Sequence, residues 1–344
     1  MHKPGKIFTS KKTVYFDHNI LNHIIRHPEI SLFKEIATDN QVVYSDETLR
    51  EIKRSVGGEK ALLNILVNLN AMHLKVYQDE NFDPTDDAVL SEADPFAAFE
   101  RTCAEDSIID KLNAATQTSL RKFYGDKKLS DFDELADEHG IAFQTLLSDL
   151  VEDVCESPLA DSLYISRLRG FVTRLLANRA NAYRQSIMMM QDYKGDGTKS
   201  AVKVYRDTVG IGPKELNNIA PPNTIEKIWE LHKPLPGYKG REFTIEDFLG
   251  ITLIPHSVKG TITDFQKIIS AYNVLNVVGY RNDSDMKHER RFTSSMSDAN
   301  HVAFASFTDF IYSSDAGLTS KAAAIYEFLK INTKICRVNI IDNR

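Results

Sequence analysis

The residues best suited to chemistry in this sequence are four carboxylates that are far apart along the chain. They are Asp17, Glu51, Asp298 and Asp315. Asp17 and Asp315 each follow a short β-branched and aromatic run, residues 13–16 and 310–312. The carboxyl ends of parallel strands meet at one edge of a sheet, where α/β proteins hold their ligands. The order of these residues therefore predicts an acidic cluster at such an edge.

An acidic cluster of this kind requires compensating positive charge. Carboxylates gathered without Lys or Arg among them repel one another and resist ionisation, unless divalent cations neutralise them. Hard oxygen ligands favour Mg²⁺ or Mn²⁺. Two such ions about 3.5–4 Å apart can activate a water and stabilise the leaving oxygen of a phosphodiester. The chemistry predicted for the cluster is that of a metal-dependent nuclease.

Each carboxylate also has a simpler structural interpretation. Asp17 fits an Asx turn, and both Asp298, expected to open a helix, and Asp315 fit helix caps. Glu51 fits a solvated helix residue, and Glu47, one turn earlier, fits a helix-dipole role. We choose Glu51 rather than Glu47 as the functional glutamate, because Glu47 lies nearer to the helix start.

The hydrophobic pattern predicts an α/β fold with a parallel sheet flanked by helices. Strand-like runs at residues 13–16 and 41–44 are each followed by apolar residues at helical spacing, and the alternation returns at residues 310–338. A repeated strand–helix order is typical of a parallel sheet. Residues 281–295 are charged and are expected to form a loop before the helix of Asp298.

The middle of the chain has a different character. Long helical patterns alternate there with acidic connections and with breaks that contain Pro or Gly. We predict a large, mainly helical insertion over residues 59–259. Residues 1–58 and 260–344 are then expected to form the α/β catalytic domain.

The acidic segments resemble the successive motifs of the PIN domain. The matching segments are residues 15–21 (YFDHNIL), 48–52 (TLREI), 297–301 (SDANH) and 309–318 (DFIYSSDAGL). The run KAAAI that follows suits a large bacterial PIN-like subgroup. The resemblance covers about residues 13–56 and 262–340, roughly a third of the chain. PIN domains are mostly metal-dependent ribonucleases, so the resemblance implies a PIN-like sheet and that activity.

The resemblance also assigns roles to individual residues. It implies that metal coordination and catalysis belong to Asp17, Glu51, Asp298 and Asp315. It implies polar support near the metal from Asn19 and from Ser313 or Ser314. His301 falls one turn after Asp298. It is a candidate for a residue that supports the metal ligands or contacts the substrate, and the alternative is a structural histidine. Small PIN domains lack a helical insertion, so its role stays open.

The charge distribution bears on a nucleic-acid partner. Residues 79–161 carry 6 basic and 22 acidic side chains, whereas residues 162–344 carry 25 and 18. Because phosphate neutralisation needs clustered Lys and Arg, the later part is the better candidate surface. The residues considered for nucleic-acid contact are Arg167, Arg174, Arg290 and Arg291. For the first two, a solvated helix face paired to the acidic segment is the simpler interpretation.

Two further motifs each lack a part. Residues 209–214 (VGIGPK) resemble the turn of a helix–hairpin–helix element, but the prolines at 221 and 222 shorten the second helix. Residues 17–19 resemble the start of haloacid dehalogenase-type phosphohydrolases, which need a second aspartate as the general acid. Asn19 cannot supply that proton.

The composition limits the remaining options. The chain has 344 residues, of which 42% are hydrophobic and 26% charged, and its net charge is −6. No apolar run approaches the roughly 18 residues of a membrane span, and no signal-peptide pattern is present, so we expect a cytoplasmic protein without a membrane partner. The three cysteines are widely spaced and specify no disulfide framework.

Together these patterns predict a PIN-like endonuclease that depends on Mg²⁺ or Mn²⁺ and has RNA as its expected substrate. The rival hypothesis is a catalytically inactive PIN-like scaffold that binds nucleic acid or a protein, with residues 79–161 as a docking or autoinhibitory surface. A regulatory protein partner and assembly into an oligomer are left open.

Overall fold

The computed structural model describes residues 10–80, 84–126, 165–173, 199–235, 242–252 and 262–339, with single positions between these ranges. The strands are β1 (Thr13–Phe16), β2 (Gln41–Ser45), β3 (Met72–Gln78), β4 (Pro84–Ser91), β5 (Phe310–Ser313) and β6 (Lys334–Arg337). The helices before the middle of the chain are α1 (His18–Arg26), α2 (Leu32–Asp39), α3 (Asp46–Arg54), α4 (Glu59–Asn68) and α5 (Pro95–Phe123). Those after it are α8 (Ala201–Val209), α9 (Pro213–Leu216), α10 (Thr224–His232), α11 (Ile245–Phe248), α12 (Asp264–Val278), α13 (Glu289–Ala305) and α14 (Ala316–Leu329).

A six-stranded sheet with the order β4-β3-β2-β1-β5-β6 forms the centre of the fold. Neighbouring strands are parallel, except that β3 and β4 form an antiparallel pair. The central strand β1 pairs with β2 on one side and β5 on the other, so Val14 lies opposite both Val42 and Phe310. The predicted α/β class and its mostly parallel sheet are therefore confirmed.

Alternating side chains of the central strands build one hydrophobic core on each face of the sheet. Tyr15, Val43 and Ile311 point into a core with α12, α13 and α14. Val14 and Tyr44 point the other way, into a core with α1, α3 and α4. Because both faces are covered at the centre of the sheet, β1 is buried throughout and β2 is buried from Val42 to Ser45, as central parallel strands usually are.

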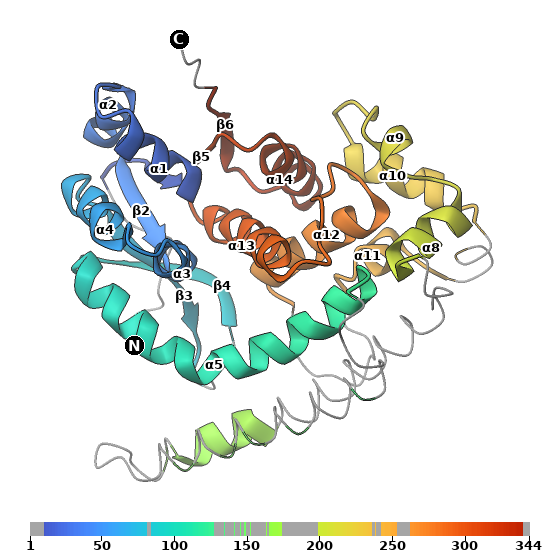
Figure 1. Ribbon diagram of the computed structural model, residues 1–344, viewed down its shortest axis with the longest axis horizontal. Helices are drawn as coiled ribbons and strands as arrows, with labels where there is room; N and C mark the ends of the chain where they lie inside the picture. Colours follow the sequence, from blue (N-terminus) through green and yellow to red (C-terminus); the bar gives the residue numbers. More distant parts are fainter. Residues whose placement is uncertain are drawn as a thin grey trace.

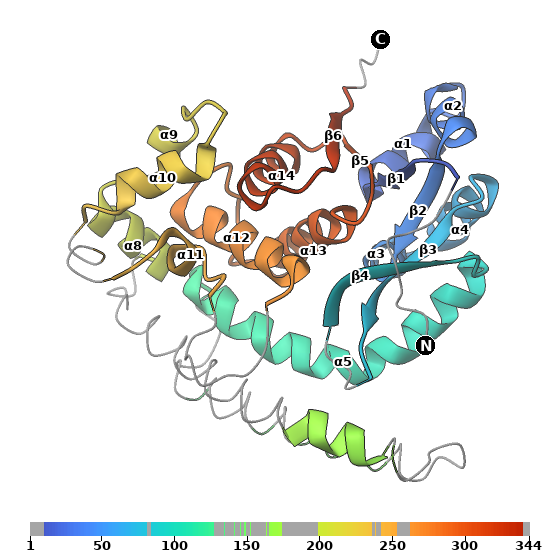
Figure 2. The same ribbon diagram turned by 180° about the vertical axis from the view of Figure 1, so that it is seen from behind.

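The helices are distributed around this sheet in a way that both views show (Figure 1, Figure 2). The helix α5 extends from below β3 and β4 toward α8 and α11 (Figure 2). The helices α12, α13 and α14 lie between the sheet and the group formed by α8, α9 and α10 (Figure 1). The carboxyl ends of β1 and β5 thus open between α1, α3, α13 and α14.

The range predicted to be a helical insertion contains part of the sheet. Strand β3 is parallel to β2, and β4 pairs with β3, so the α/β part continues beyond residue 58. The acidic sequence of β4 (PTDDAVLS) does not predict a strand. In this edge strand only alternate residues are covered, so polar side chains are tolerated. The rest of the described chain between residues 95 and 252 is helical, and its separation as an insertion stays a prediction.

The helix of Asp298 begins earlier than the sequence suggested. Residues 281–295 were expected to form a loop, but α13 starts at Glu289. Its first turn, Glu-Arg-Arg, is polar because it is exposed, and Phe292 is the first buried residue of the helix. Within the described part of the chain, each helix is too short or too polar to traverse a bilayer.

Candidate metal centre

Two of the four predicted carboxylates lie at the carboxyl ends of adjacent strands. Asp17 directly follows β1 and caps α1, and Asp315 follows β5 and caps α14 by accepting from Leu318 N at 2.8 Å. The Ser313 hydroxyl connects them: it donates to Asp17 Oδ2 at 2.6 Å and accepts from Asp315 N at 3.0 Å. The simpler interpretation of both residues as caps is therefore correct, and it is compatible with a shared site.

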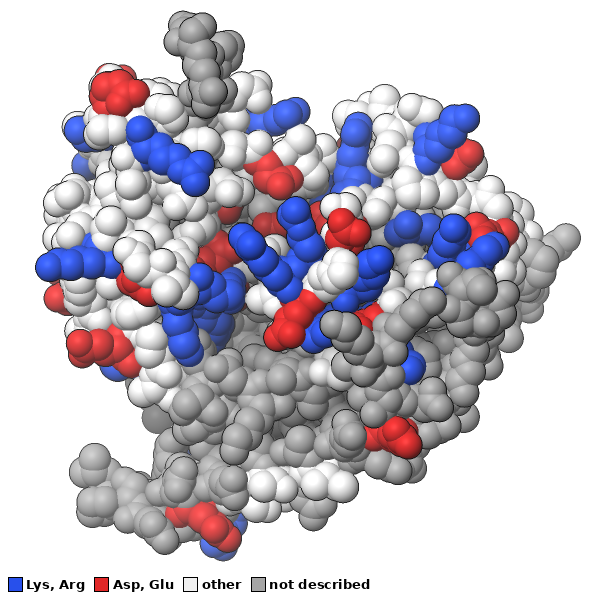
Figure 3. Space-filling model, in the orientation of Figure 1, with Lys and Arg blue, Asp and Glu red and all other residues white. Residues whose placement is uncertain are grey.

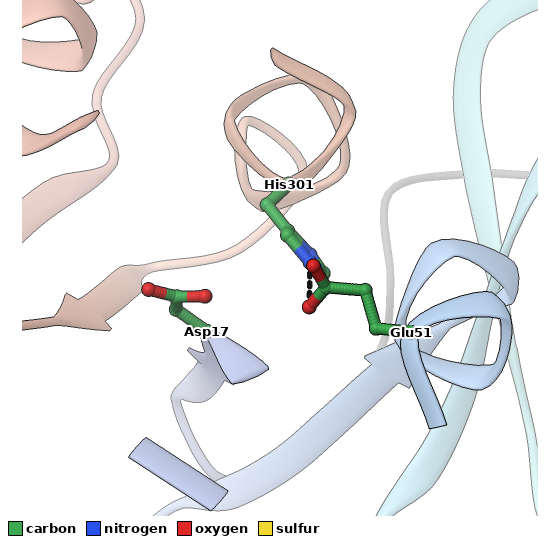
Figure 4. Close-up of side chains that lie close together, drawn as sticks. All are labelled: Asp17, Glu51 and His301. Carbon is green, nitrogen blue, oxygen red and sulfur yellow. Dashed lines mark hydrogen bonds and ion pairs between the residues drawn. The ribbon is translucent and has the colours of Figure 1, made fainter. Parts of the chain in front are cut away.

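Glu51 and His301 complete a compact group with Asp17 (Figure 4). One ligand atom from each of these three side chains lies within 4.8 Å of the other two. Glu51 belongs to α3 and His301 to α13, and His301 Nε2 lies 2.9 Å from Glu51 Oε2. On its other side, His301 Nδ1 lies 2.7 Å from the hydroxyl of Tyr15, which is buried in β1. The three residues come from both ends of the chain.

The electrostatics of this group depend on which neighbours each carboxylate has. Burial would raise the pKa of Glu51, but His301, His18 and Arg54 outweigh it and lower the pKa to about 2. Burial raises the pKa of Asp17, and Glu51 raises it further against the opposing effect of His301. Glu51 is therefore stabilised as an anion, whereas Asp17 is a carboxylate whose negative charge is disfavoured.

Asp298 lies in the third turn of α13, so the helix-cap interpretation of this residue is wrong. Among the described residues it has neither a hydrogen bond nor an ion pair. Burial raises its pKa well above the ordinary value, and Asp17, Asp283 and Asp315 raise it further. This shift requires several carboxylates close to Asp298. Asp17, Glu51 and Asp315 thus interact electrostatically with Asp298, and these four carboxylates are here called the acidic pocket.

A fifth carboxylate, Asp283, was missed by the sequence analysis. It lies in the connection before α13 and accepts from Lys321 Nζ at 2.9 Å and from Ser295 Oγ. Lys321, from α14, is fully buried and also donates to Asn276 Oδ1 at 2.8 Å. The sequence signal was weak, because Asp283 stood among many charged residues. Its charge is paired with Lys321, whose ammonium also interacts electrostatically with Asp298 and Asp315.

Glu47, the residue passed over in favour of Glu51, has a structural role beside the pocket. Its side chain is buried and accepts from Ser297 Oγ at 2.6 Å and from Asn300 Nδ2 at 2.9 Å. Arg54 also bonds it at 3.0 Å. Glu47 therefore connects α3 to α13 and so fixes the helices that carry Glu51 and Asp298.

The predicted polar supports divide into two groups. Ser313 and Asn19 both donate to Asp17, the latter through Nδ2 at 3.2 Å. Ser314 instead pairs with His23 Nε2 at 3.3 Å. Ser313, rather than Ser314, is thus the serine that contacts the acidic pocket.

The four arginines predicted to contact nucleic acid differ in their surroundings. Arg167 pairs with Glu80 at 3.2 Å, as expected for a helix face paired to the acidic segment. Arg174 lies outside the described residues. Arg290 and Arg291 are exposed in the first turn of α13, on the same helix as Asp298.

The surface around the pocket carries both signs of charge. Figure 3 shows acidic atoms in a hollow near the middle of this face, with Lys and Arg side chains along its rim. A cleft of about 900 Å³ adjoins Asp283 and is lined by Lys203, Arg206 and Lys287, among others. Residues 210–213, from the segment that resembles a helix–hairpin–helix turn, line this cleft, and the helix α9 that follows is only four residues long.

The donor set fits a divalent cation. Carboxylate oxygens dominate it, and burial raises the pKa values of Asp17 and Asp298, to which neighbouring carboxylates add. In addition, the buried hydroxyl of Tyr272 has no hydrogen-bond partner among the described residues. Asp17, Glu51, Asp298 and Asp315 are the residues that would hold the ion, and His301 would orient Glu51 through the hydrogen bond from Nε2.

Comparison with known protein families, with curated proteins and with solved structures gives no match.

Proposed function

We propose that this chain is a PIN-like, metal-dependent endonuclease that hydrolyses phosphodiester bonds, with RNA as its expected substrate. The proposal names Mg²⁺ or Mn²⁺ as the cofactor and Asp17, Glu51, Asp298 and Asp315 as its ligands. One observation carries the proposal. Asp17, Glu51 and His301 offer ligand atoms within 4.8 Å of one another, at a strand edge where burial and neighbouring carboxylates raise the pKa of Asp298.

The bound cation would supply charge neutralisation and an activated water for attack on phosphorus. The residues of the chain have separate tasks around it. Ser313 and Asn19 hold the Asp17 carboxylate in one orientation, since both donate to its oxygens. His301, on α13, orients the Glu51 carboxylate through a hydrogen bond between Nε2 and Oε2. Outer hydrogen bonds of this kind commonly change metal affinity by about 10–100-fold when removed.

The cleft next to Asp283 supports a polyanionic substrate. Its lining side chains include the ammonium groups of Lys203 and Lys287. The guanidinium of Arg206 is fixed by bonds to the carbonyl oxygens of Asn276 and Val277 at 2.6 and 2.8 Å. Cations beside an acidic, metal-binding pocket suit a phosphate backbone that must approach it.

Cleavage assays test this proposal. Purified wild type is expected to cut single-stranded RNA with Mn²⁺ or Mg²⁺ and to be inactive in EDTA. Asp17→Asn and Asp298→Asn are expected to remove activity while the circular dichroism spectrum stays that of wild type. Asp39→Asn, at the exposed end of α2, is the matched control and should retain activity. Full activity of either cluster variant would refute the assignment, and a parallel DNA substrate separates ribonuclease from deoxyribonuclease.

One observation favours the scaffold alternative. Glu51 is already neutralised by His301 and Arg54, and Asp283 by Lys321, so part of the pocket is balanced without a metal. A scaffold of this kind should bind RNA or a protein with the same affinity in Mn²⁺ and in EDTA and should form no product over hours. The nuclease should show metal-dependent cleavage.

A further inference from the structure

The cleft of about 900 Å³ lies between the turn that joins α8 to α9 and the connection before α13. This volume can hold a nucleotide, since sites for small molecules usually measure about 300–1,000 Å³. One lining residue, Asp283, lies at the edge of the acidic pocket. The Oδ1 atoms of Asp315 and Asp283 lie 3.2 and 4.0 Å from the position that a β-carbon on Gly317 would occupy. The cleft therefore ends beside a carboxylate of the proposed metal centre.

Both walls of the cleft are fixed to the end of α12. From α8, Arg206 donates to the carbonyl oxygen of Asn276 at 2.6 Å. Pro213 packs so closely against Gly279 that a β-carbon on this glycine would lie 2.9 Å from the proline ring. On the opposite wall, the backbone N of Asp283 donates to Asn276 Oδ1 at 3.1 Å. The cleft is therefore preformed.

The charged side chains that line the cleft leave a surplus of positive charge. Among the described lining residues four are basic and three are acidic: Lys199, Lys203, Arg206 and Lys287 against Asp207, Asp283 and Asp285. Asp283 pairs with Lys321, which is not a lining residue, at 2.9 Å. Asp207 pairs with Lys199 at 2.6 Å and also interacts electrostatically with Lys203. Lys203 and Lys287 are exposed, so their ammonium groups are placed to meet an anion.

The uncharged lining residues suit the other parts of a nucleotide. They include Tyr124, Ile211 and Pro213. The Tyr124 ring is held by an edge-to-face contact with Phe292, with 6.2 Å between the ring centroids. Sites for single-stranded nucleic acid combine aromatic rings, on which bases stack, with cations that meet the phosphates. A run of acidic residues supplies negative charge but no planar base, so this lining favours a nucleic acid over an acidic polypeptide.

We propose that this cleft is a binding subsite for single-stranded RNA, in which Lys203 and Lys287 contact the phosphates of a nucleotide that flanks the one at the acidic pocket. This inference rests on the proposed function, because the strand passes from one place to the other. It adds a requirement to that function: the substrate must extend beyond the scissile bond far enough to reach the cleft. The turn at residues 210–213, outside the PIN-like segments of the sequence, then serves substrate binding.

RNA binding in EDTA tests the subsite in the absence of cleavage. Fluorescence anisotropy follows a labelled single-stranded RNA of about 12 nucleotides, a length within the range that such sites occupy. Lys203→Gln and Lys287→Gln should each weaken binding by roughly fivefold at about 0.1 M salt. Each should also reduce the slope of log affinity against log salt concentration by about 0.7. Unchanged affinity and slope in either variant would overturn the proposal.

Two controls test whether the effect is local and specific for RNA. Lys233→Gln, at the exposed end of α10 and outside the lining, should bind RNA like wild type. An equal loss in this control would mean that only the total charge matters, which contradicts a subsite. Polyaspartate of matched charge should bind wild type at least about fivefold more weakly than RNA, the value of one stacked base. Equal or tighter binding of polyaspartate would assign the cleft to a protein partner instead.

Turnover of two substrates separates the subsite from the metal centre. With Mn²⁺, the variant that combines Lys203→Gln and Lys287→Gln should have a KM for RNA raised by roughly 25-fold, the product of the two single losses. Its kcat should stay close to that of wild type, since contacts made equally before and in the transition state change only KM. Bis(p-nitrophenyl) phosphate has no flanking nucleotide and should be hydrolysed equally by both proteins. Loss of this activity in the variant would mean that the lysines act on the metal centre, against the proposal.

The outcomes for the cleft and for the proposed function are distinguishable. If wild type cleaves nothing but binds RNA through Lys203 and Lys287, the nuclease proposal fails and the subsite stands. If wild type cleaves RNA and the cleft variants bind and cleave it equally well, the subsite fails and the nuclease proposal stands. Absence of both cleavage and RNA binding refutes both.

Discussion

Ser313 Oγ lies 2.6 Å from Asp17 Oδ2, although 296 positions of sequence separate the two residues. The same hydroxyl accepts from the backbone N of Asp315 at 3.0 Å. One small side chain thus orients the carboxylate that follows β1 and the turn that carries the carboxylate after β5. Its neighbour Ser314 makes neither contact and pairs with His23.

Ser313→Ala is expected to weaken Mn²⁺ binding by about tenfold, because Asp17 loses a hydrogen bond that fixes its rotamer and lowers its pKa. Isothermal titration calorimetry measures the affinity. Ser314→Ala is the matched control and should bind Mn²⁺ like wild type. Equal losses in the two variants would show that the Ser313 hydroxyl has no special role at Asp17.

Asp298→Asn is expected to stabilise the protein in EDTA at neutral pH, by about 0.5–2 kcal/mol, the range of single stabilising substitutions. The folded-state pKa of Asp298 is raised, so the folded state holds a proton that the unfolded state has lost. Stability in EDTA should therefore fall as the pH rises above the ordinary aspartate range, and the variant should lack this slope.

Urea unfolding across this pH range measures the effect of Asp298→Asn. In Mn²⁺ the wild type should be more stable than Asp298→Asn, the reverse of the order in EDTA. The wild type gains stability by binding the ion, whereas the variant has lost one of its ligands. A variant that is less stable than wild type in EDTA would contradict the unpaired state assigned to Asp298.

Glu51→Gln should have the opposite pH signature in EDTA. The folded-state pKa of Glu51 is lowered from 4.5 to about 2 by His301, His18 and Arg54, against the effect of burial. Its contribution to stability is therefore present in full above about pH 4.5 and is lost as the pH falls toward 2.

At neutral pH the loss in Glu51→Gln should be about 3 kcal/mol or less, from the size of the pKa shift. The gap between wild type and variant should narrow as the pH approaches about 3. Chemical unfolding of both proteins at several pH values checks this expectation. A gap that does not change with pH would mean that the Glu51 charge has no stabilising partner.

Lys321→Met should strongly destabilise the protein, by about 3–5 kcal/mol, because the Asp283 carboxylate loses its buried cation. Asp283→Asn added to Lys321→Met should recover most of this loss, since no unpaired charge remains. The free energies of unfolding of wild type, both single variants and the double variant form the cycle. Additive losses would show that the two side chains do not stabilise each other.

The sequence predicted the structure well where a strand-like run of residues ends directly before an aspartate and a helix. Residues 13–16 are apolar and β-branched or aromatic, and the helical spacing after Asp17 marks the end of the strand. The same reasoning holds for Asp315, and it predicted a parallel sheet with acids at one edge. It could not give the register of strands or the order β4-β3-β2-β1-β5-β6, because these depend on packing between distant segments.

The missed residues share a physical cause. Asp283 becomes notable only as the ion-pair partner of the buried Lys321, and that pairing arises when α14 packs against α12. Asp298 was assigned to a helix start, because the exposed first turn of α13 has no apolar residue to mark it. In each case tertiary contact, rather than local pattern, decides the role.

The adjacency of β1 and β5 has a consequence for the newly made polypeptide. Asp17 leaves the ribosome early, whereas Asp315 and the strand that precedes it follow almost three hundred residues later. Until then β1 lacks its neighbour on one side, and no carboxylate quartet can assemble. Products that terminate before residue 315 therefore lack a complete acidic cluster, and under the function proposed above they would have no metal centre with which to cut RNA.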